Sequence, residues 1–387
     1  MQINIHPNID IISEEIVEIR RDLHKFPELA FNEHRTSSII IKKLKSYGLK
    51  PLSKIGKTGV IADLHCANSK KMIALRADMD ALPINEDGNL EYKSVHDGIM
   101  HACGHDGHVA MLLGAARALT SDPSKLNCNI RFIFQPAEEG KGGARYMIED
   151  GALEGVDEIY GLHLWNYQQY GEIGVQTGPV MASADIFRII IRGRGGHGAT
   201  PHTSNDAIIA ASALIQSIQT IVSRDTNPIE SSVVTIGTIN GGYNFNVIAD
   251  TIEMKGTTRA YTEKVRELIK ERLKKIIKGT EEMFNVKITL EYEDGYPPTI
   301  NHDGPTSKVR TAAREVVGDG TKPPYLTMAG EDFSYYLNNI PGCFFFIGSS
   351  PDDQRLMDTP HHCSHFNINE KSLLIGSSAL VNIAELS

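Results

Sequence analysis

Hydrophobic residues in the first third of the chain recur at helical spacing and then gather in short runs. Intervals of three and four residues over Ile16–Phe26 predict an amphipathic helix that begins near Ser13, and a second helix is predicted over Thr36–Tyr47. An alanine-rich apolar stretch predicts a buried helix over Val109–Leu119. Buried strands are predicted over Met72–Leu75, Ile130–Phe134 and Glu158–Leu164. Strands and helices alternate, which predicts an α/β fold.

Polar side chains follow or accompany each of these strands. Asp78 and Asp80 come just after the first strand, Glu138 and Glu139 follow the second, and His163 lies near the end of the third. The carboxyl ends of parallel strands meet at one edge of a sheet, where α/β proteins place their functional groups. We therefore expect these residues to approach one another.

The stretch from residue 184 to about residue 295 has a different order of elements. Its pattern predicts strand, helix, strand, strand, helix and strand, the order of a ferredoxin-like unit. The predicted ranges are Ile186–Ile191, Asn205–Ser223, Ser232–Ile239, Thr251–Thr258, Thr262–Met283 and Val286–Tyr292.

The last part of the chain returns to mixed elements. A helix is predicted over Ser307–Val317, a strand over Cys343–Ile347, and a final helix from Ser372. The simplest organisation is one discontinuous α/β domain formed by residues 1–183 and 296–387, with residues 184–295 inserted as a separate domain.

Composition narrows the possible partners and compartments. The formal net charge of -9 argues against a broad nucleic-acid surface. No run of 18 apolar residues predicts a membrane span, and the N-terminus lacks the pattern of a secretory signal. The five cysteines are odd in number and scattered, which is typical of a reducing cytoplasm rather than of a disulfide framework.

The densest chemistry lies in MHACGHDGH, residues 100–108. This segment carries His101, Cys103, His105, Asp106 and His108. A lone buried histidine is usually a core residue, but such a concentration of imidazole, thiolate and carboxylate favours a metal site. Cys103 and His105 are the candidate ligands that this segment adds to the donors elsewhere in the chain.

The remaining candidate donors are dispersed along the chain. They are Asp78, Asp80, Glu138, Glu139, His163, His361 and His362. Two divalent ions about 3.5–4 Å apart need roughly this many donors, whereas a structural zinc site closes with four ligands in paired spacings that this chain lacks. The pattern therefore favours an open catalytic site. At an irregular strand end, Glu138 and Glu139 can both reach one cleft, one as a ligand and one as a proton carrier.

Three residues of the inserted domain are weaker candidates. His197 is flanked by glycines in GGHGATPHT, so its imidazole is accessible and suited to stabilise an oxyanion, although a loop histidine without a chemical role fits equally well. Asn246 and Arg259 are suited to bind a substrate carboxylate, Arg259 through its planar fork.

Seven segments in order resemble a known family over most of the chain, from about residue 20 to residue 376. They are RADMDALP, MHACGHDGHVAMLLGAA, FQPAEEGKGGA, GLHLW, GRGGHGATPH, AGEDFSYY and HHCSHFNINE. Together they resemble the N-acyl-amino-acid amidohydrolases related to hippurate hydrolase and to the plant hydrolases of indole-acetyl amino acids. These enzymes belong to the aminoacylase and carboxypeptidase clan of two-metal hydrolases.

The resemblance implies a fold and a set of roles. The fold is a metal-binding α/β catalytic domain with an inserted ferredoxin-like lid, through which a homo-oligomer (dimer or tetramer) forms. The implied metal ligands are Cys103, His105, Glu139, His163 and His362, with His361 as the alternative to His362. Glu138 matches the general base, His197 a lid histidine that steadies the oxyanion, and Asn246 and Arg259 lid residues near the substrate carboxylate.

Two positions depart from the wider clan. Many relatives carry histidine at position 78 and aspartate at position 103, where this chain has Asp78 and Cys103. We therefore expect Asp78 and Asp80 to support the ligands rather than to bind metal. The implied cofactors are two divalent ions, manganese, zinc, cobalt or nickel, and a thiolate ligand favours the softer ones.

The implied activity is metal-dependent hydrolysis of the amide bond in a small N-acyl-amino acid. The alternative is a dipeptidase or aminopeptidase with the same metal site. A free α-ammonium group needs an acidic partner, whereas an acyl group needs an apolar pocket. A non-catalytic metal-binding or thiol-redox protein that uses Cys103 would leave Glu138 and the inserted domain unexplained.

Overall fold

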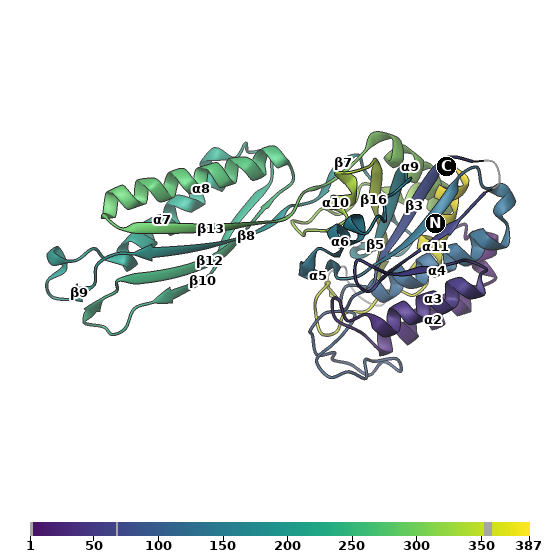
Figure 1. Cartoon of the computed structure of the whole chain (residues 1–387), viewed down its shortest axis with the longest axis horizontal. Helices are drawn as coiled ribbons and strands as arrows, with labels where there is room; N and C mark the ends of the chain where they lie inside the picture. The colour runs from purple at the N-terminus through teal and green to yellow at the C-terminus, as the bar shows by residue number, and fades with distance from the viewer. Residues whose placement is uncertain (1–2, 67–68, 352–357) are drawn as a thin grey trace. The chain divides into compact units, whose positions relative to one another are not determined.

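The computed structural model describes residues 3–66, 69–351 and 358–387, and it divides them into two compact units (Figure 1). Unit 1 contains the chain up to Val180, Ile300–Tyr325 and Asp332–Ser387. Unit 2 contains Met181–Thr299 and the short segment Leu326–Glu331.

Unit 1 is built on an eight-stranded mixed sheet in the order β1-β2-β4-β3-β5-β16-β6-β15. Its central strands β4, β3, β5 and β16 run parallel to one another, and β1 and β2 extend the sheet in antiparallel fashion. The strands are β1 Leu52–Ile55, β2 Gly59–Leu64, β3 Met72–Asp78, β4 Asn129–Gln135, β5 Glu158–Gln169, β6 Ile173–Gly174, β15 Thr321–Lys322 and β16 Gly342–Ser350.

Helices of unit 1 pack on this sheet and bury it. Every residue of β3 and β16 is buried, as expected for parallel strands covered on both faces. Helices α2, α4, α9 and α11 share one hydrophobic core with the sheet. The helices are α1 Pro7–Asp10, α2 Ser13–Lys25, α3 His34–Ser46, α4 His105–Ser121, α5 Glu138–Lys141, α6 Gly143–Glu149, α9 Asp303–Val317, α10 Ser334–Leu337 and α11 Ser372–Glu385.

Unit 2 is a four-stranded antiparallel sheet in the order β10-β12-β8-β13, with two helices packed on it through a second core. Its elements follow the order strand, helix, strand, strand, helix, strand, which is the ferredoxin-like arrangement. They are β8 Ala184–Arg192, α7 Ala207–Thr220, β10 Ser232–Gly241, β12 Thr251–Ala260, α8 Glu263–Phe284 and β13 Lys287–Tyr296. A small pair, β9 Gly196–His197 with β11 Val247–Ile248, lies beyond the end of β8.

The predicted α/β fold with an inserted ferredoxin-like unit is confirmed, and each predicted helix or strand has a counterpart. The predicted start of the first helix near Ser13 is confirmed, because Ser13 is the first helical residue of α2. Ile12 occupies the cap position, and no side chain caps the helix. By contrast, Asp206 accepts hydrogen bonds from the N–H groups of Ile208 and Ile209, so it caps α7 as its position suggests.

The segment Ala207–Asp225, α7 with its last turn, is long and apolar enough to cross a membrane by length and composition. A third of its most apolar window is buried in unit 2, where Ala210, Leu214 and Ile218 face the second core. Core helices of soluble proteins pass the same test of length and composition.

Candidate metal centre and active site

The carboxyl ends of the central parallel strands bring the candidate donors together. Asp78 is the last residue of β3, Glu138 and Glu139 follow the end of β4, and His163 lies in the middle of β5. Strands β4, β3 and β5 are direct neighbours in the sheet. Residues separated by up to 85 positions in the sequence therefore converge at one edge, as their positions after the strands suggest.

A sharp bend before α4 places Cys103 and His105. Gly104 has φ +95°, a left-handed conformation that favours glycine, and α4 begins at the next residue, His105. Gly107, one turn into the helix, has no space for a side chain, because an added Cβ would lie 2.4 Å from Cδ1 of Leu164. The two glycines thus bend the chain and let α4 pack closely on β5.

The predicted ligands form overlapping groups whose donor atoms lie within 4.8 Å of one another. One group contains Cys103, His105 and His163, a second contains Cys103, Glu139 and His362, and a third contains His105, Glu138 and Glu139. Sγ of Cys103 lies 3.5 Å from Nε2 of His163. Nδ1 of His163 is 2.6 Å from the carbonyl of Leu164, to which it donates, so Nε2 keeps its lone pair toward Cys103.

The two adjacent histidines near the C-terminus differ in their surroundings. His361 is packed between aromatic rings, and its Nε2 accepts the N–H of Asn166 at 3.3 Å while Nδ1 lies 3.9 Å from Sγ of Cys103. Burial lowers the pKa of His361 to about 3. His362 is half exposed, its backbone is left-handed at φ +66°, and its Nε2 lies 3.2 Å from Oε1 of Glu139.

The site concentrates negative charge around an imidazole nitrogen that has no hydrogen-bond partner. His105 is fully buried, and its Nδ1 donates to the carbonyl of Asp80 at 2.9 Å. Its Nε2 makes no hydrogen bond within the described residues. Burial alone would lower the pKa of His105, but Asp78, Asp80 and Glu139 outweigh it and raise the pKa to about 10. The surroundings therefore favour a positive charge at this nitrogen.

Burial and the charges of Glu139, Glu138 and Asp78 raise the pKa of the Cys103 thiol well above its usual value. A thiolate at this position therefore needs a cation beside it, and binding a metal there would release the thiol proton. Thiolate, imidazole and carboxylate donors are a suitable set for softer divalent ions. The partnerless Nε2 of His105 and the grouped donors fit such ions.

The two aspartates near the end of β3 have neighbours that orient other groups. Asp80 accepts the backbone N–H groups of Glu138 and Glu139, each at 3.0 Å. Asp78 accepts from His108 at 2.6 Å and from Arg76 at 2.7 Å. Burial would raise the pKa of Asp78, but His105, Arg76 and His108 hold it well below its usual range.

His108 and Asp106, from the dense cluster, are used in hydrogen bonds and ion pairs. Nε2 of His108 accepts the N–H of Leu164 at 2.9 Å, so both ring nitrogens of His108 have partners. Asp106 binds the buried Arg20 and His24, each at 2.8 Å. His101 is buried, and neither of its nitrogens has a hydrogen-bond partner within the described residues.

Sequence reasoning missed three buried charged residues that surround the turn carrying Glu138. Glu33 accepts the N–H of Ala137 at 2.9 Å, and Asp332 accepts the N–H of Ala144 at 2.9 Å. Arg76 is buried in β3 and binds Asp332 at 2.9 Å. A charged residue inside an otherwise apolar strand is a signal that could have identified Arg76. Glu33 gives no such signal, because it lies in a polar stretch.

The turn itself is irregular. Ala137 is left-handed at φ +56°, and Glu139 departs from helical geometry with ψ 85°. This irregularity lets both adjacent glutamates face His105, as expected for an irregular strand end. Burial raises the pKa of Asp332 to about 6, although Arg76 opposes that rise.

Within unit 2, His197 and Asn246 are neighbours at one end of the sheet. His197 pairs with Val247 in the β9–β11 ladder, and the N–H of Gly198 donates to the carbonyl of Asn246 at 2.8 Å. Nδ1 of His197 accepts the N–H of Ala199 at 3.0 Å, which leaves an exposed Nε2–H as a donor.

Arg259 lies at the opposite end of the unit 2 sheet. Thr251, the first residue of β12, pairs with Arg192, the last residue of β8. The chain continues from this end of the sheet to β9. Arg259 is eight residues further along β12, about 26 Å away at the rise of a strand. Within the described part of the chain its guanidinium donates to Oγ1 of Thr257 and to the carbonyl of Thr258, at 3.0 Å for the latter.

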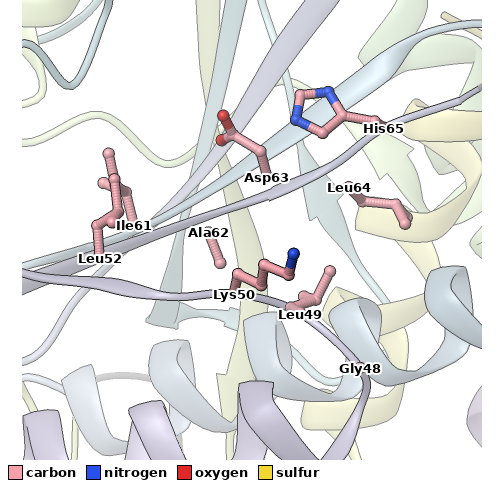
Figure 2. A pocket seen from close by; sticks show the side chains of 9 residues that line it. All are labelled: Gly48, Leu49, Lys50, Leu52, Ile61, Ala62, Asp63, Leu64 and His65. Carbon is pink, nitrogen blue, oxygen red and sulfur yellow. The ribbon is translucent and has the colours of Figure 1, made fainter.

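A pocket of about 410 Å³ lies elsewhere in unit 1, along the edge strand β1 and its neighbour β2 (Figure 2). Its lining includes Lys50, Asp63 and His65 among apolar side chains. Asp63 is already held by Arg131 at 2.7 Å, and none of the predicted ligands contributes to the lining. This pocket is therefore separate from the donor cluster.

The fold and the donor set together define a class, the hydrolases that hold divalent metal at the edge of an α/β sheet and carry an inserted ferredoxin-like unit. Residues 74–386 match the model of peptidase family M20/M25/M40. The chain therefore belongs to this family.

Relatives with experimental or curated descriptions cover nearly the whole chain. It is 43% identical over 378 residues to N-acetyl-L-cysteine deacetylase of Bacillus subtilis, covering 98% of this chain and 89% of that protein. It is 38% identical over 388 residues to hippurate hydrolase of Campylobacter jejuni, covering 98% of each. A solved structure of the YXEP protein of Bacillus subtilis, described as a dinuclear metal binding peptidase, has a TM-score of 0.86, 34% identity and coverage of 97% and 98%.

Metal binding is expected to protect Cys103 from alkylation. The donors around its sulfur are within 4.8 Å, so an ion there would occupy the thiolate lone pairs. We expect slow labelling of Cys103 by iodoacetamide in metal-loaded protein and faster labelling after chelation, measured by peptide mass spectrometry. Cys66, which is partly exposed and belongs to none of the donor groups, is the internal control and should label equally in both states. Equal labelling of Cys103 in both states would contradict the metal site.

Proposed function

We propose that this protein hydrolyses the amide bond of N-acyl-amino acids, releasing a carboxylic acid and a free amino acid. The observation that carries the proposal is the convergence of Cys103, His105, Glu139, His163 and His362 in overlapping groups of donors, one of which also includes Glu138. The whole-length similarity to an N-acetyl-L-cysteine deacetylase and a hippurate hydrolase supports the amide-cleaving chemistry.

The residues of this cluster would hold two divalent ions, of manganese, zinc, cobalt or nickel. The bound ions supply Lewis-acid polarisation of the acyl carbonyl and acidify water. His362 is the ligand rather than His361, because Nε2 of His361 already accepts a backbone N–H and its other nitrogen then carries the proton. Cys103 and Glu139 each belong to two of the donor groups, so each could contribute to the binding of more than one ion.

Glu138 takes the proton of the attacking water and gives it to the leaving amine. Two constraints hold this carboxylate in place. Asp80 fixes the backbone of Glu138 and Glu139, and the N–H of Asp332 donates to Oε1 of Glu138 at 3.4 Å. A general base must lie within hydrogen-bond reach of the water whose proton it takes, so a fixed carboxylate favours this role.

A group of aromatic side chains lies beside the donor cluster. It supports the proposal that the substrate carries an acyl group on its nitrogen rather than a free α-ammonium group. Tyr167 and Tyr325 stack with ring centroids 5.4 Å apart, and Tyr167 also lies 5.4 Å from the ring of His361. The indole N–H of Trp165 fixes the carbonyl of Tyr325 at 2.9 Å. Tyr325 is 45% exposed, so its ring is available to a substrate. This arrangement offers an apolar surface to the acyl group of an N-acyl-amino acid.

A second copy of the chain completes the site. His197 and Asn246 lie at the end of unit 2 opposite to Arg259, so one substrate cannot contact all three within a single unit 2. In this assembly Arg259 binds the substrate carboxylate, and the Nε2–H of His197 from the other copy stabilises the oxyanion. Exposed apolar side chains on unit 2 support such an association, namely Ile208, Ile209, Ile239, Tyr243 and Phe245.

The enzyme works in a reducing cytoplasm on a small-molecule substrate. All five cysteines are free in the structure, which fits that compartment. The net charge of -9 argues against a broad nucleic-acid surface.

Glu138→Ala is expected to keep both metal ions and to lose nearly all turnover. General acid–base groups typically contribute about 10²–10⁴-fold to the rate. Metal content by plasma emission spectroscopy and kcat with N-acetyl and N-benzoyl amino acids test this. Glu149→Ala, on the same segment but at the end of α6, is the control and should retain full activity. Substantial activity in Glu138→Ala would exclude the proposed role.

Tyr325→Ala is expected to lower kcat/KM about two- to tenfold for N-benzoyl amino acids and far less for N-acetyl amino acids. An aromatic pair contributes about 0.5–1.5 kcal/mol, which corresponds to this factor. Tyr325→Phe keeps the ring and should behave as the wild type. Equal losses on both acyl groups would place the acyl pocket elsewhere, and faster cleavage of free dipeptides would favour the peptidase alternative.

Mixing two inactive variants tests the contribution of a second copy. Glu138→Ala and His197→Ala are each expected to be inactive, but their heterodimers contain one site with both residues. Random exchange of subunits should restore about a quarter of wild-type activity, because half of the dimers then carry one intact site of two. A control mixture of either variant with itself should stay inactive. If no activity returns on mixing under conditions that exchange subunits, His197 acts within its own chain or not at all.

A further inference from the structure

Arg76 is a fully buried arginine whose donors point in three directions. It lies in β3, with 1% of its surface exposed. Nη1 donates to Oδ2 of Asp78 at 2.7 Å, Nη2 donates to Oδ1 of Asp332 at 2.9 Å, and Nε donates to the side-chain oxygen of Gln135 at 2.9 Å. One guanidinium thus joins β3, the end of β4 and the segment before α10.

On one side, Arg76 reaches the metal-binding residues through Asp78. The other oxygen of Asp78 accepts from Nδ1 of His108 at 2.6 Å, and His108 in turn holds the N–H of Leu164, next to His163. Oδ2 of Asp78 also lies 3.8 Å from Nε2 of His105. The position of Asp78 therefore affects two of the proposed ligands.

On the other side, Arg76 reaches the turn of Glu138 through Asp332. The carboxylate of Asp332 accepts the N–H of Ala144 at 2.9 Å and the side-chain amide of Gln135 at 2.9 Å. These two residues flank the turn that carries Glu138. The backbone N–H of Asp332 donates to Oε1 of Glu138 itself at 3.4 Å.

Asp78 and Asp332 are both fully buried, and burial of two carboxylates requires a compensating cation. The planar fork of arginine supplies charge and directed hydrogen bonds at once, whereas a lysine ammonium supplies the charge alone. We propose that Arg76 is a positioning residue that fixes the general-base turn relative to the metal-binding residues. The expected effect of Arg76 on the rate rests on the proposed function. Its expected effect on metal affinity rests on the metal site alone.

Arg76→Lys tests this directly. At saturating metal, kcat is expected to fall about 10–100-fold, because the carboxylate of Glu138 is no longer held in position. KM is expected to change by less than about threefold, because the substrate-binding residues of the inserted unit are unchanged. Metal affinity, measured by competition with a fluorescent chelator and Mn²⁺ alone, is expected to fall about tenfold.

Arg131→Lys is the control in the next strand of the same sheet. Arg131 also binds a carboxylate through its fork, with Asp63 at 2.8 and 2.7 Å, but it has no contact with the donor cluster. We expect this variant to match the wild type in kcat and metal affinity. If replacing a buried arginine fork acted only on stability, the melting temperature of both Arg76→Lys and Arg131→Lys would fall. The selective loss of kcat in Arg76→Lys would then be absent.

Asp332→Asn provides an independent route if Arg76→Lys folds poorly. It is expected to lower kcat while leaving KM similar, and the double variant Arg76→Lys/Asp332→Asn should lose little more than the larger single loss, because both act on the same turn. Additive losses, or wild-type kcat and metal affinity in Arg76→Lys, would overturn the proposal. Absence of N-acyl-amino acid hydrolysis by the wild type would instead contradict the proposed function, and the metal-affinity comparison would still decide the role of Arg76.

Discussion

The concentration of buried acidic groups at the carboxyl edge of the unit 1 sheet is the constraint on which the rest of the structure depends. Asp78, Asp80, Asp332 and Glu138 are buried there, with Glu139 and the thiol of Cys103 beside them. Such a group of anions is unfavourable unless cations offset it. Arg76 offsets part of this charge, and the raised pKa values of His105 and Cys103 reflect the remainder. Bound divalent ions would offset it directly, so the electrostatics and the proposed catalysis share one cause.

The fold could be predicted from local patterns because they agree with the tertiary structure. Apolar runs marked the buried strands, and the order of six elements identified the inserted ferredoxin-like unit. The candidate donors could be predicted because chemistry-bearing residues follow parallel strands, whose ends must converge. The sequence leaves His361 and His362 as alternatives, because contacts that distinguish adjacent histidines, such as the N–H of Asn166 that Nε2 of His361 accepts, are set by the tertiary structure. Glu33 and Asp332 were missed for the same reason, because their role is to accept backbone N–H groups of a turn that is distant in sequence.

The inserted unit shows a limit of local patterns. Asn246 and Arg259 were both predicted to lie near the substrate carboxylate, and strand register separates Arg259 from Asn246 and His197 by most of the length of β12. Register is a long-range property that no local pattern reports. This separation makes a second copy of the chain part of the proposed mechanism rather than an addition to it.

The most direct test of the account is a stepwise titration of metal-free protein with Mn²⁺, with the rate of N-benzoyl-amino acid hydrolysis measured at each addition. The account predicts that activity rises with metal and reaches its plateau at two ions per chain, because the donor groups around Cys103 and His105 serve two neighbouring ions. Full hydrolytic activity in the metal-free protein, or the absence of any bound metal, would contradict it.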